Sequence, residues 1–234
     1  MSFTLNSHVS NRNHLLAGLP MAVSGRILPH LELVQVQSGQ NIPVCDSTFP
    51  YIYFPTTAIL SVYYDMEDGA SVEIVGVGNE GMLGVAFFMG GIAMSPLVIA
   101  HTTGYCCRVN GRVMMEEFKR CGSLMHMVMR YAHSFISQVS QSAGCNRHHS
   151  VEQRLCRLLL TCSDRLSSNE LDMTHELIAS RLGVRREGVT KAAGDLHSCG
   201  IIDYRRGHIM IIDRSGLESH VCECYKLLRK EFHH

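Results

Sequence analysis

The spacing of hydrophobic residues changes near residue 110 of the chain. Before this point most apolar residues lie in short stretches, one of which, segment 31–37, alternates with polar residues. Such stretches predict short β-strands. Beyond residue 110 apolar residues recur every three or four positions, which predicts helices. We therefore expect an α+β protein whose strands precede its main helices.

The strands are close together in the sequence, which favours a small antiparallel β-roll or barrel. Two short helical segments, 12–19 and 24–31, precede them and are interrupted by Pro20 and Pro29. A further short helix, 113–120, follows them. The predicted strands are 31–37, 51–54, 58–64, 71–77, 97–100 and 104–109.

A helix of about twenty residues is predicted next, because one narrow apolar row continues along it. The spacing of this row is close to 3.5 residues, which is typical of two helices packed against each other and predicts a homodimer. Packing of the helix against its own domain is the alternative that the sequence leaves open. The residues of the row are Leu124, Val128, Tyr131, Phe135 and Val139.

The last third of the chain predicts a winged helix-turn-helix. Gly183 separates two short helical segments, the first of which has Thr174 as its N-cap, and Gly200 ends the second. Two short helices joined by a tight glycine turn are typical of a helix-turn-helix. The two strands after it form a hairpin. The predicted elements are helices 150–166, 174–182 and 185–199, and strands 201–204 and 208–212.

The second of these short helices begins with residues suited to reading DNA. Arg186 can donate two hydrogen bonds to guanine, and Glu187 can accept one from cytosine. The whole chain has 21 cationic and 21 acidic residues, whereas segment 181–191 has four cations and one anion. A solvated helix face in a non-binding hairpin is the alternative. The predicted DNA-contacting residues include both base and phosphate contacts. They are Thr174, His175, Arg181, Arg185, Arg186, Glu187, Thr190, Lys191, Arg205 and Arg206.

This segment resembles the winged helix of the Crp/Fnr family, the relatives of the cyclic-AMP receptor protein. The family pattern is Gly, two residues, Arg-Glu, then Val and a basic residue two positions later. The chain departs from the family at Gly188, where Thr is common, and in having Lys rather than Arg at position 191. The matching residues are Gly183, Arg186, Glu187, Val189 and Lys191.

The resemblance covers nearly the whole chain and implies its organisation. A sensor β-roll similar to cyclic-nucleotide-binding domains would occupy residues 10–122, a dimerisation helix 123–147, and the winged helix-turn-helix 148–234. The implied function is that of a dimeric transcriptional regulator that reads a pseudo-palindromic site in double-stranded DNA. RNA polymerase and an unidentified small-molecule effector are further candidate partners.

The glycine-rich segment 78–91, with the residues that follow it, resembles the phosphate-binding cassette of the cyclic-nucleotide roll. The family places Glu after a glycine and Arg before a serine, whereas here Val85 follows Gly84 and Met94 precedes Ser95. Each lost charged hydrogen bond costs about 1–3 kcal/mol, so we expect that cyclic AMP is not the effector. The remaining residues form either the pocket of another ligand or ordinary core. These residues are Gly84, Val85, Phe87, Met94 and Ser95.

Several other functions are not expected. The spacing of Gly76, Gly78 and Gly81 matches a dinucleotide fingerprint, but the acidic residue required about twenty positions later is missing. The sequence has no nucleophile elbow, paired-carboxylate constellation or H-E-x-x-H motif, so we expect no enzyme. It also has no secretory signal and no apolar stretch long enough to cross a bilayer, so we expect a cytoplasmic protein without a membrane partner.

Ten cysteines and fourteen histidines raise the possibility of metal or redox sensing. Cys145, His148, His149, Cys222 and Cys224 offer soft ligands, but ordinary thiols and histidines are the simpler interpretation, so we assign no metal site. The Fnr branch holds an iron–sulfur cluster through N-terminal cysteines. Here the first cysteine lies at position 45, so we expect no such cluster. The alternative function is a ligand- or metal/redox-sensing module whose helical domain binds protein.

Overall fold

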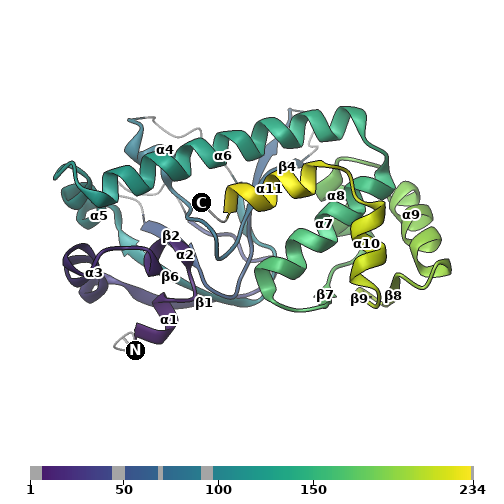
Figure 1. Ribbon diagram of the computed structural model, residues 1–234, viewed down its shortest axis with the longest axis horizontal. Helices are drawn as coiled ribbons and strands as arrows, with labels where there is room; N and C mark the ends of the chain where they lie inside the picture. Colours follow the sequence, from purple (N-terminus) through teal and green to yellow (C-terminus); the bar gives the residue numbers. More distant parts are fainter. Residues whose placement is uncertain (1–6, 44–50, 68–70, 91–96, 233–234) are drawn as a thin grey trace. The chain divides into compact units, whose positions relative to one another are not determined.

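The structure is a computed structural model that describes residues 7–43, 51–67, 71–90 and 97–232 (Figure 1). The chain forms two compact units. Unit 1 comprises Met1–Tyr63 and Gly76–Ile136, and unit 2 comprises Tyr64–Val75 and Ser137–His234. The last boundary, between Ile136 and Ser137, falls within helix α6 (Ser123–His148), between the predicted domain limits at residues 122 and 147.

Antiparallel strands form the framework of unit 1. They make two three-stranded sheets, one with the order β1-β6-β2 and the other with the order β4-β3-β5, although Tyr64–Val75, which includes the end of β3 and most of β4, is assigned to unit 2. In the first sheet Glu32 lies opposite Arg108, and Tyr51 lies opposite Asn110. All six predicted strands are present, with ends that differ by two residues or fewer. The strands are β1 Glu32–Val36, β2 Tyr51–Pro55, β3 Leu60–Asp65, β4 Ser71–Val77, β5 Leu97–Ala100 and β6 Gly104–Asn110.

The short helices of unit 1 differ in part from the predictions. The second predicted helix was expected to start at residue 24, but α3 begins directly after Pro20, because the fixed φ of proline suits the start of a helix. Pro29 lies within the short 3₁₀ helix η1. The helices are α1 Ser7–Ser10, α2 His14–Ala17, α3 Met21–Ile27, η1 Leu28–His30, α4 Val85–Phe88 and α5 Gly111–Phe118.

The first turns of α6 pack against the main core of unit 1. Leu124 and Val128 are buried in the same cluster as Phe54 of β2 and Met114 of α5. Tyr131 and Phe135 are partly buried against this cluster, and Val139 is also partly buried. The prediction that this row forms the dimer interface is therefore wrong for Leu124 and Val128, because the protein's own core covers them.

Unit 2 contains the helical part of the chain and one small sheet. Helix α7 (Val151–Leu166) packs against α8 (His175–Leu182) and α9 (Arg186–Ser198). The sheet has the order β7 (Glu170–Asp172), β9 (His208–Ile211), β8 (Ile202–Arg205). The predicted helices and hairpin are confirmed. Strand β7 (Glu170–Asp172) and helices α10 (Arg214–His220) and α11 (Cys224–Phe232) were not predicted from the sequence.

Among the described residues, no helix has both the length and the apolar character needed to cross a lipid bilayer.

Candidate nucleic-acid interface

Helices α8 and α9 form a helix-turn-helix whose ends are well defined. At the start of α8 the Thr174 hydroxyl accepts a hydrogen bond from the Leu177 amide at 3.2 Å. Gly183 ends the helix with φ of 60°, a left-handed conformation that glycine adopts without steric cost. Extended Arg185 then leads into α9. The turn between the two helices is therefore only three residues long.

Helix α9 has one buried face and one exposed face. Aliphatic residues Val189, Ala192, Ala193 and Leu196 are buried in unit 2. The predicted reading residues are all exposed, in two adjacent rows in which Arg186 precedes Thr190 and Glu187 precedes Lys191 by four positions. Exposed Arg185 precedes them at the N-cap. The exposed residues are Arg185, Arg186, Glu187, Thr190 and Lys191.

A cluster of polar and aromatic side chains joins α8, α9 and strand β8 (Ile202–Arg205). The His175 Nδ1 lies 3.2 Å from the Thr190 hydroxyl, and the His175 ring lies 5.1 Å from the ring of Tyr204. Burial lowers the pKa of His175, and the charge of Arg186 lowers it further. The imidazole therefore favours its neutral form. Tyr204 was not among the predicted DNA-contacting residues, although an aromatic residue directly before two arginines was a usable signal.

The wing is a tight hairpin between β8 and β9 (His208–Ile211). Its two turn residues, Arg206 and Gly207, have φ of 44° and 89°. Consecutive positive φ values match the twist of the flanking strands in two-residue hairpins. Arg205 and Arg206 are exposed, and the Arg205 guanidinium lies 3.4 Å from the carboxylate of Asp203. The wing therefore presents two cations at its tip.

Arg181 differs from the other predicted DNA-contacting residues, because its side chain is only 2% exposed. Its guanidinium forms an ion pair with Glu73 at 2.6 Å and lies 3.4 Å from the sulfur of Cys162. The predicted phosphate contact is therefore wrong for this residue in the structure. A buried, paired guanidinium cannot reach a phosphate.

The glycine-rich segment of unit 1 lies at the start of α4. Gly84 has φ of 102°, and a Cβ atom there would lie 2.5 Å from the Cδ1 of Ile52, so only glycine fits. Val85 is buried in the core of unit 1, and Phe87 packs against it. Val85 and Phe87 therefore agree with the alternative in which this segment forms ordinary core rather than the pocket of another ligand. Met94 and Ser95 lie outside the described residues.

The outer face of α6 carries a row of exposed residues with alternating spacings of four and three. Met129 is 57% exposed and Ile136 is 55% exposed, which is high for large apolar side chains. They lie seven positions apart, as in the heptad of a two-stranded coiled coil. The row consists of Met129, His133, Ile136, Ser140, Ala143 and Arg147.

Four of the five residues that the sequence suggested as soft metal ligands come together in unit 2. Cys145, His149, Cys222 and Cys224 each place a ligand atom within 4.8 Å of the others. His148 is exposed and is not part of this group.

Comparisons with known proteins agree with this architecture. Residues 153–220 match the sequence profile of the Crp-like helix-turn-helix domain. A solved structure described as a candidate Crp/Fnr-family transcriptional regulator from Eubacterium rectale is similar over 90% of this chain and 98% of its own, with a TM-score of 0.67 and 21% identity. No curated protein matches the sequence.

Two further solved structures share the fold. A CRP-family transcriptional regulator from Thermus thermophilus has a TM-score of 0.66 and 20% identity, covering 80% of this chain and 95% of its own. FixK2 from Bradyrhizobium japonicum has a TM-score of 0.68 and 16% identity, covering 82% and 98%.

Proposed function

We propose that the chain is a Crp/Fnr-type transcriptional regulator that reads a specific DNA sequence with α9 and contacts the flanking backbone with the β8–β9 wing. The observation that carries this proposal is the division of α9 into two faces. The aliphatic face of α9 is buried in unit 2, whereas Arg186, Glu187 and Lys191 are all exposed. An α-helix with this arrangement can enter the major groove and offer its N-terminal side chains to base edges.

Different residues contribute to sequence recognition and to affinity. Arg186 and Glu187, in the first turn of α9, are suited to guanine and cytosine. Arg205 and Arg206 at the wing tip and Lys191 one turn further along α9 are suited to phosphates. These exposed cations outnumber the neighbouring anions Glu187 and Asp203, so the interface is positive although the whole chain is neutral.

Salt dependence of DNA binding tests the proposal. Because cations that contact phosphates release counterions, affinity for a duplex of random sequence should fall steeply with salt concentration. Lys191→Ala should weaken binding to all sequences and reduce the slope of log affinity against log salt by about 1. Lys226→Ala, which removes an exposed cation from α11, is the matched control. It should leave both the affinity for DNA and its salt dependence unchanged. A protein that does not bind duplex DNA, or binds it independently of salt, would contradict the proposal.

We also propose that two copies of the chain pair through the outer row of α6. Met129 and Ile136 are exposed apolar side chains on one face, and small residues Ser140 and Ala143 continue that face. Apolar positions seven residues apart allow two helices to interlock, and small residues allow close approach. This row replaces the predicted row of Leu124 and Val128 as the candidate interface.

The sensing ligand is proposed to be different from cyclic AMP. In the family cassette a carboxylate follows the glycine, but here Val85 stands in this position and is buried in the core. No carboxylate is therefore available there to accept a hydrogen bond from a ribose hydroxyl. Isothermal titration of cyclic AMP into the full chain should show no binding in the micromolar range. Saturable micromolar binding would overturn this part of the proposal.

A further inference from the structure

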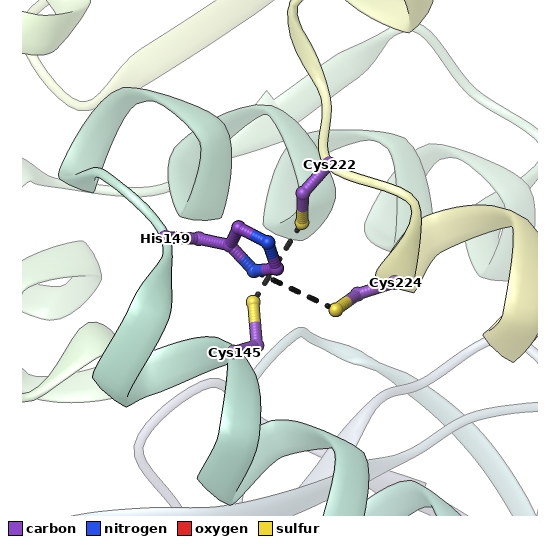
Figure 2. A group of neighbouring side chains, drawn as sticks. All are labelled: Cys145, His149, Cys222 and Cys224. Carbon is purple, nitrogen blue, oxygen red and sulfur yellow. Dashed lines mark hydrogen bonds between the residues drawn. The ribbon is translucent and has the colours of Figure 1, made fainter.

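The group formed by Cys145, His149, Cys222 and Cys224 is the most concentrated set of soft ligand atoms among the described residues (Figure 2). Figure 2 shows the four side chains converging from the end of α6 and from the connection that leads into α11. The Cys145 and Cys222 sulfurs are 3.7 Å apart. The Cys224 sulfur is 3.7 Å from Nδ1 of His149. The three cysteines are buried.

The sequence spacing explains why these side chains meet. Cys145 and His149 are four residues apart, and the His149 amide donates a hydrogen bond to the Cys145 carbonyl at 3.1 Å. The last turn of α6 therefore places both side chains on one face. Cys222 lies in the connection between α10 and α11, and Cys224, on the other side of Glu223, is the first residue of α11. The pattern is C-x3-H followed by C-x-C, with more than seventy residues between the two halves.

We propose that these four residues bind one zinc ion through three thiolate sulfurs and the Nδ1 of His149. Zinc–sulfur bonds of about 2.3 Å and zinc–nitrogen bonds of about 2.0 Å in a tetrahedron place two sulfurs about 3.8 Å apart. The same geometry places a sulfur and a nitrogen about 3.5 Å apart. The Cys145–Cys222 and Cys224–His149 separations, both 3.7 Å, are close to these values, and all four ligand atoms lie within 4.8 Å of one another, so small side-chain movements would bring them around a single tetrahedral ion.

The residues that surround the four ligands support the same assignment. Nε2 of His149 lies 3.4 Å from the carboxylate of Glu223, so the ring can donate its proton there and turn Nδ1 toward the sulfurs. A carboxylate behind a histidine is the usual partner that orients a zinc ligand. Three thiolates around Zn²⁺ leave one net negative charge, and Arg157 acts electrostatically on Cys145. This cation can offset that charge.

Two other interpretations of the cluster fit less well. A disulfide would require its sulfurs to be about 2.05 Å apart, much closer than those of Cys145 and Cys222. A multi-iron cluster would separate its ligands, because iron and sulfide atoms would lie between them. Ordinary core packing would mix cysteine with aliphatic side chains, whereas the buried residues of this cluster are Cys145, Cys222 and Cys224.

The site would be structural. All four positions of the tetrahedron are taken by protein ligands, which is typical of structural rather than catalytic zinc. The ion would join the end of α6 to the start of α11. The binding free energy would thereby contribute to the folding of the C-terminal helices of unit 2.

Titration of Co²⁺ into the metal-free, reduced full-length protein tests the proposal. Cobalt replaces zinc in tetrahedral sites and gives intense d–d absorption together with thiolate-to-cobalt charge transfer. We expect both signals to saturate at one ion per chain and to disappear when Zn²⁺ is added. A weak octahedral spectrum, or a stoichiometry that does not saturate, would overturn the proposal. So would a Cys145–Cys222 disulfide in protein purified without oxidant, detected by mass spectrometry.

Variants separate this site from the other thiols and histidines. Cys224→Ser should remove most of the charge-transfer signal and weaken Co²⁺ binding, whereas exposed Cys199→Ser and His148→Ala should bind like the parent. Glu223→Gln keeps all four ligands and changes a side chain that is 72% exposed. It should therefore keep the tetrahedral spectrum and bind about 10- to 100-fold more weakly. Because this variant should fold normally, unchanged affinity would count against the proposed role of Glu223, and equal binding by Cys224→Ser would overturn the site.

Discussion

Arg186 is the residue whose removal should most clearly separate sequence recognition from general affinity. It lies at the start of α9, exposed, with its backbone carbonyl accepting a hydrogen bond from Thr190 at 3.1 Å. A bidentate contact to guanine is lost in Arg186→Ala. We expect the affinity for the preferred sequence to fall by about 1–3 kcal/mol, with relaxed preference at one base position.

A competition binding assay with single-base variants of the preferred duplex measures this effect. Arg229→Ala removes an exposed arginine from α11 and should leave the base preference unchanged. If Arg186→Ala weakened binding to every duplex equally, the residue would be a phosphate contact and the assignment of base reading would fail.

Single residues show which features of the candidate DNA interface can be predicted from the sequence. Gly183 and the polar start of α9 were predictable, because a turn residue and helical spacing are local properties. Burial of Arg181 was not, since it depends on Glu73, more than one hundred positions earlier. The contact between His175 and Tyr204 is likewise made by residues from separate elements. Long-range pairing of this kind leaves no periodic signal in the sequence.

At the scale of elements, the β8–β9 wing has a strained backbone conformation at a residue that also carries a positive charge. Arg206 adopts φ of 44°, in the left-handed region that disfavours residues with a Cβ atom. Asn tolerates this region better, so Arg206→Asn should raise the free energy of unfolding by up to about 1 kcal/mol. The same substitution removes a cation and should weaken DNA binding.

Urea unfolding and DNA titration of the same samples test these opposite effects. Arg205→Asn removes a neighbouring cation from β8 without the strained backbone. It should weaken DNA binding without raising stability. Equal stability changes in the two variants would show that the turn strain has no measurable cost.

An ion pair between α3 and α5 predicts an acid-sensitive element in unit 1. Both carboxylate oxygens of buried Glu117 accept hydrogen bonds from Arg26, at 2.7 and 2.6 Å. These hydrogen bonds are the main cause that lowers the pKa of Glu117. Because the pKa is lower in the folded protein, the pair stabilises unit 1 above the unfolded value of about 4.3. This contribution is lost as the pH falls through the folded pKa.

Glu117→Gln should therefore be less stable than the parent at pH 7, by up to about 1 kcal/mol, because solvent screens the partly exposed Arg26. The difference should shrink toward zero as the pH falls below about 4. Urea unfolding followed by circular dichroism at several pH values measures it. Exposed Glu116, next to Glu117, supplies the control. Glu116→Gln should change the free energy of unfolding little at any pH. A constant difference across the pH range would mean that the pair does not titrate as described.

The elements also show where periodicity stops being informative. The six strands were predicted because each has its own alternation or apolar run. The row on α6 was identified as apolar, but spacing alone does not say which surface covers it. The core of unit 1 covers Leu124 and Val128, while Met129 and Ile136, on the other face, remain exposed. The metal ligands were seen as two short motifs, and only the fold of unit 2 brings them together.

At the scale of the whole molecule, pairing through α6 would determine how DNA is read. Ile136 is more than half exposed and lies in the proposed interface row. A charge placed there would be buried without a partner in the dimer, which is costly. We expect Ile136→Glu to be monomeric in sedimentation experiments at concentrations where the parent is a dimer. Arg130→Glu changes an exposed residue one position outside the row and should remain dimeric.

The same variant should change the kind of DNA site that is selected. Two α9 helices related by a two-fold axis read inverted half-sites whose centres lie about 10 base pairs apart. Selection from random duplexes should therefore return an inverted repeat with the parent protein and a single half-site, bound more weakly, with Ile136→Glu. Both proteins should prefer the same bases within a half-site, because α9 is unchanged. If the parent selected only a single half-site, α6 would not pair the reading helices. If Ile136→Glu still selected the inverted repeat as tightly as the parent, another surface would form the dimer.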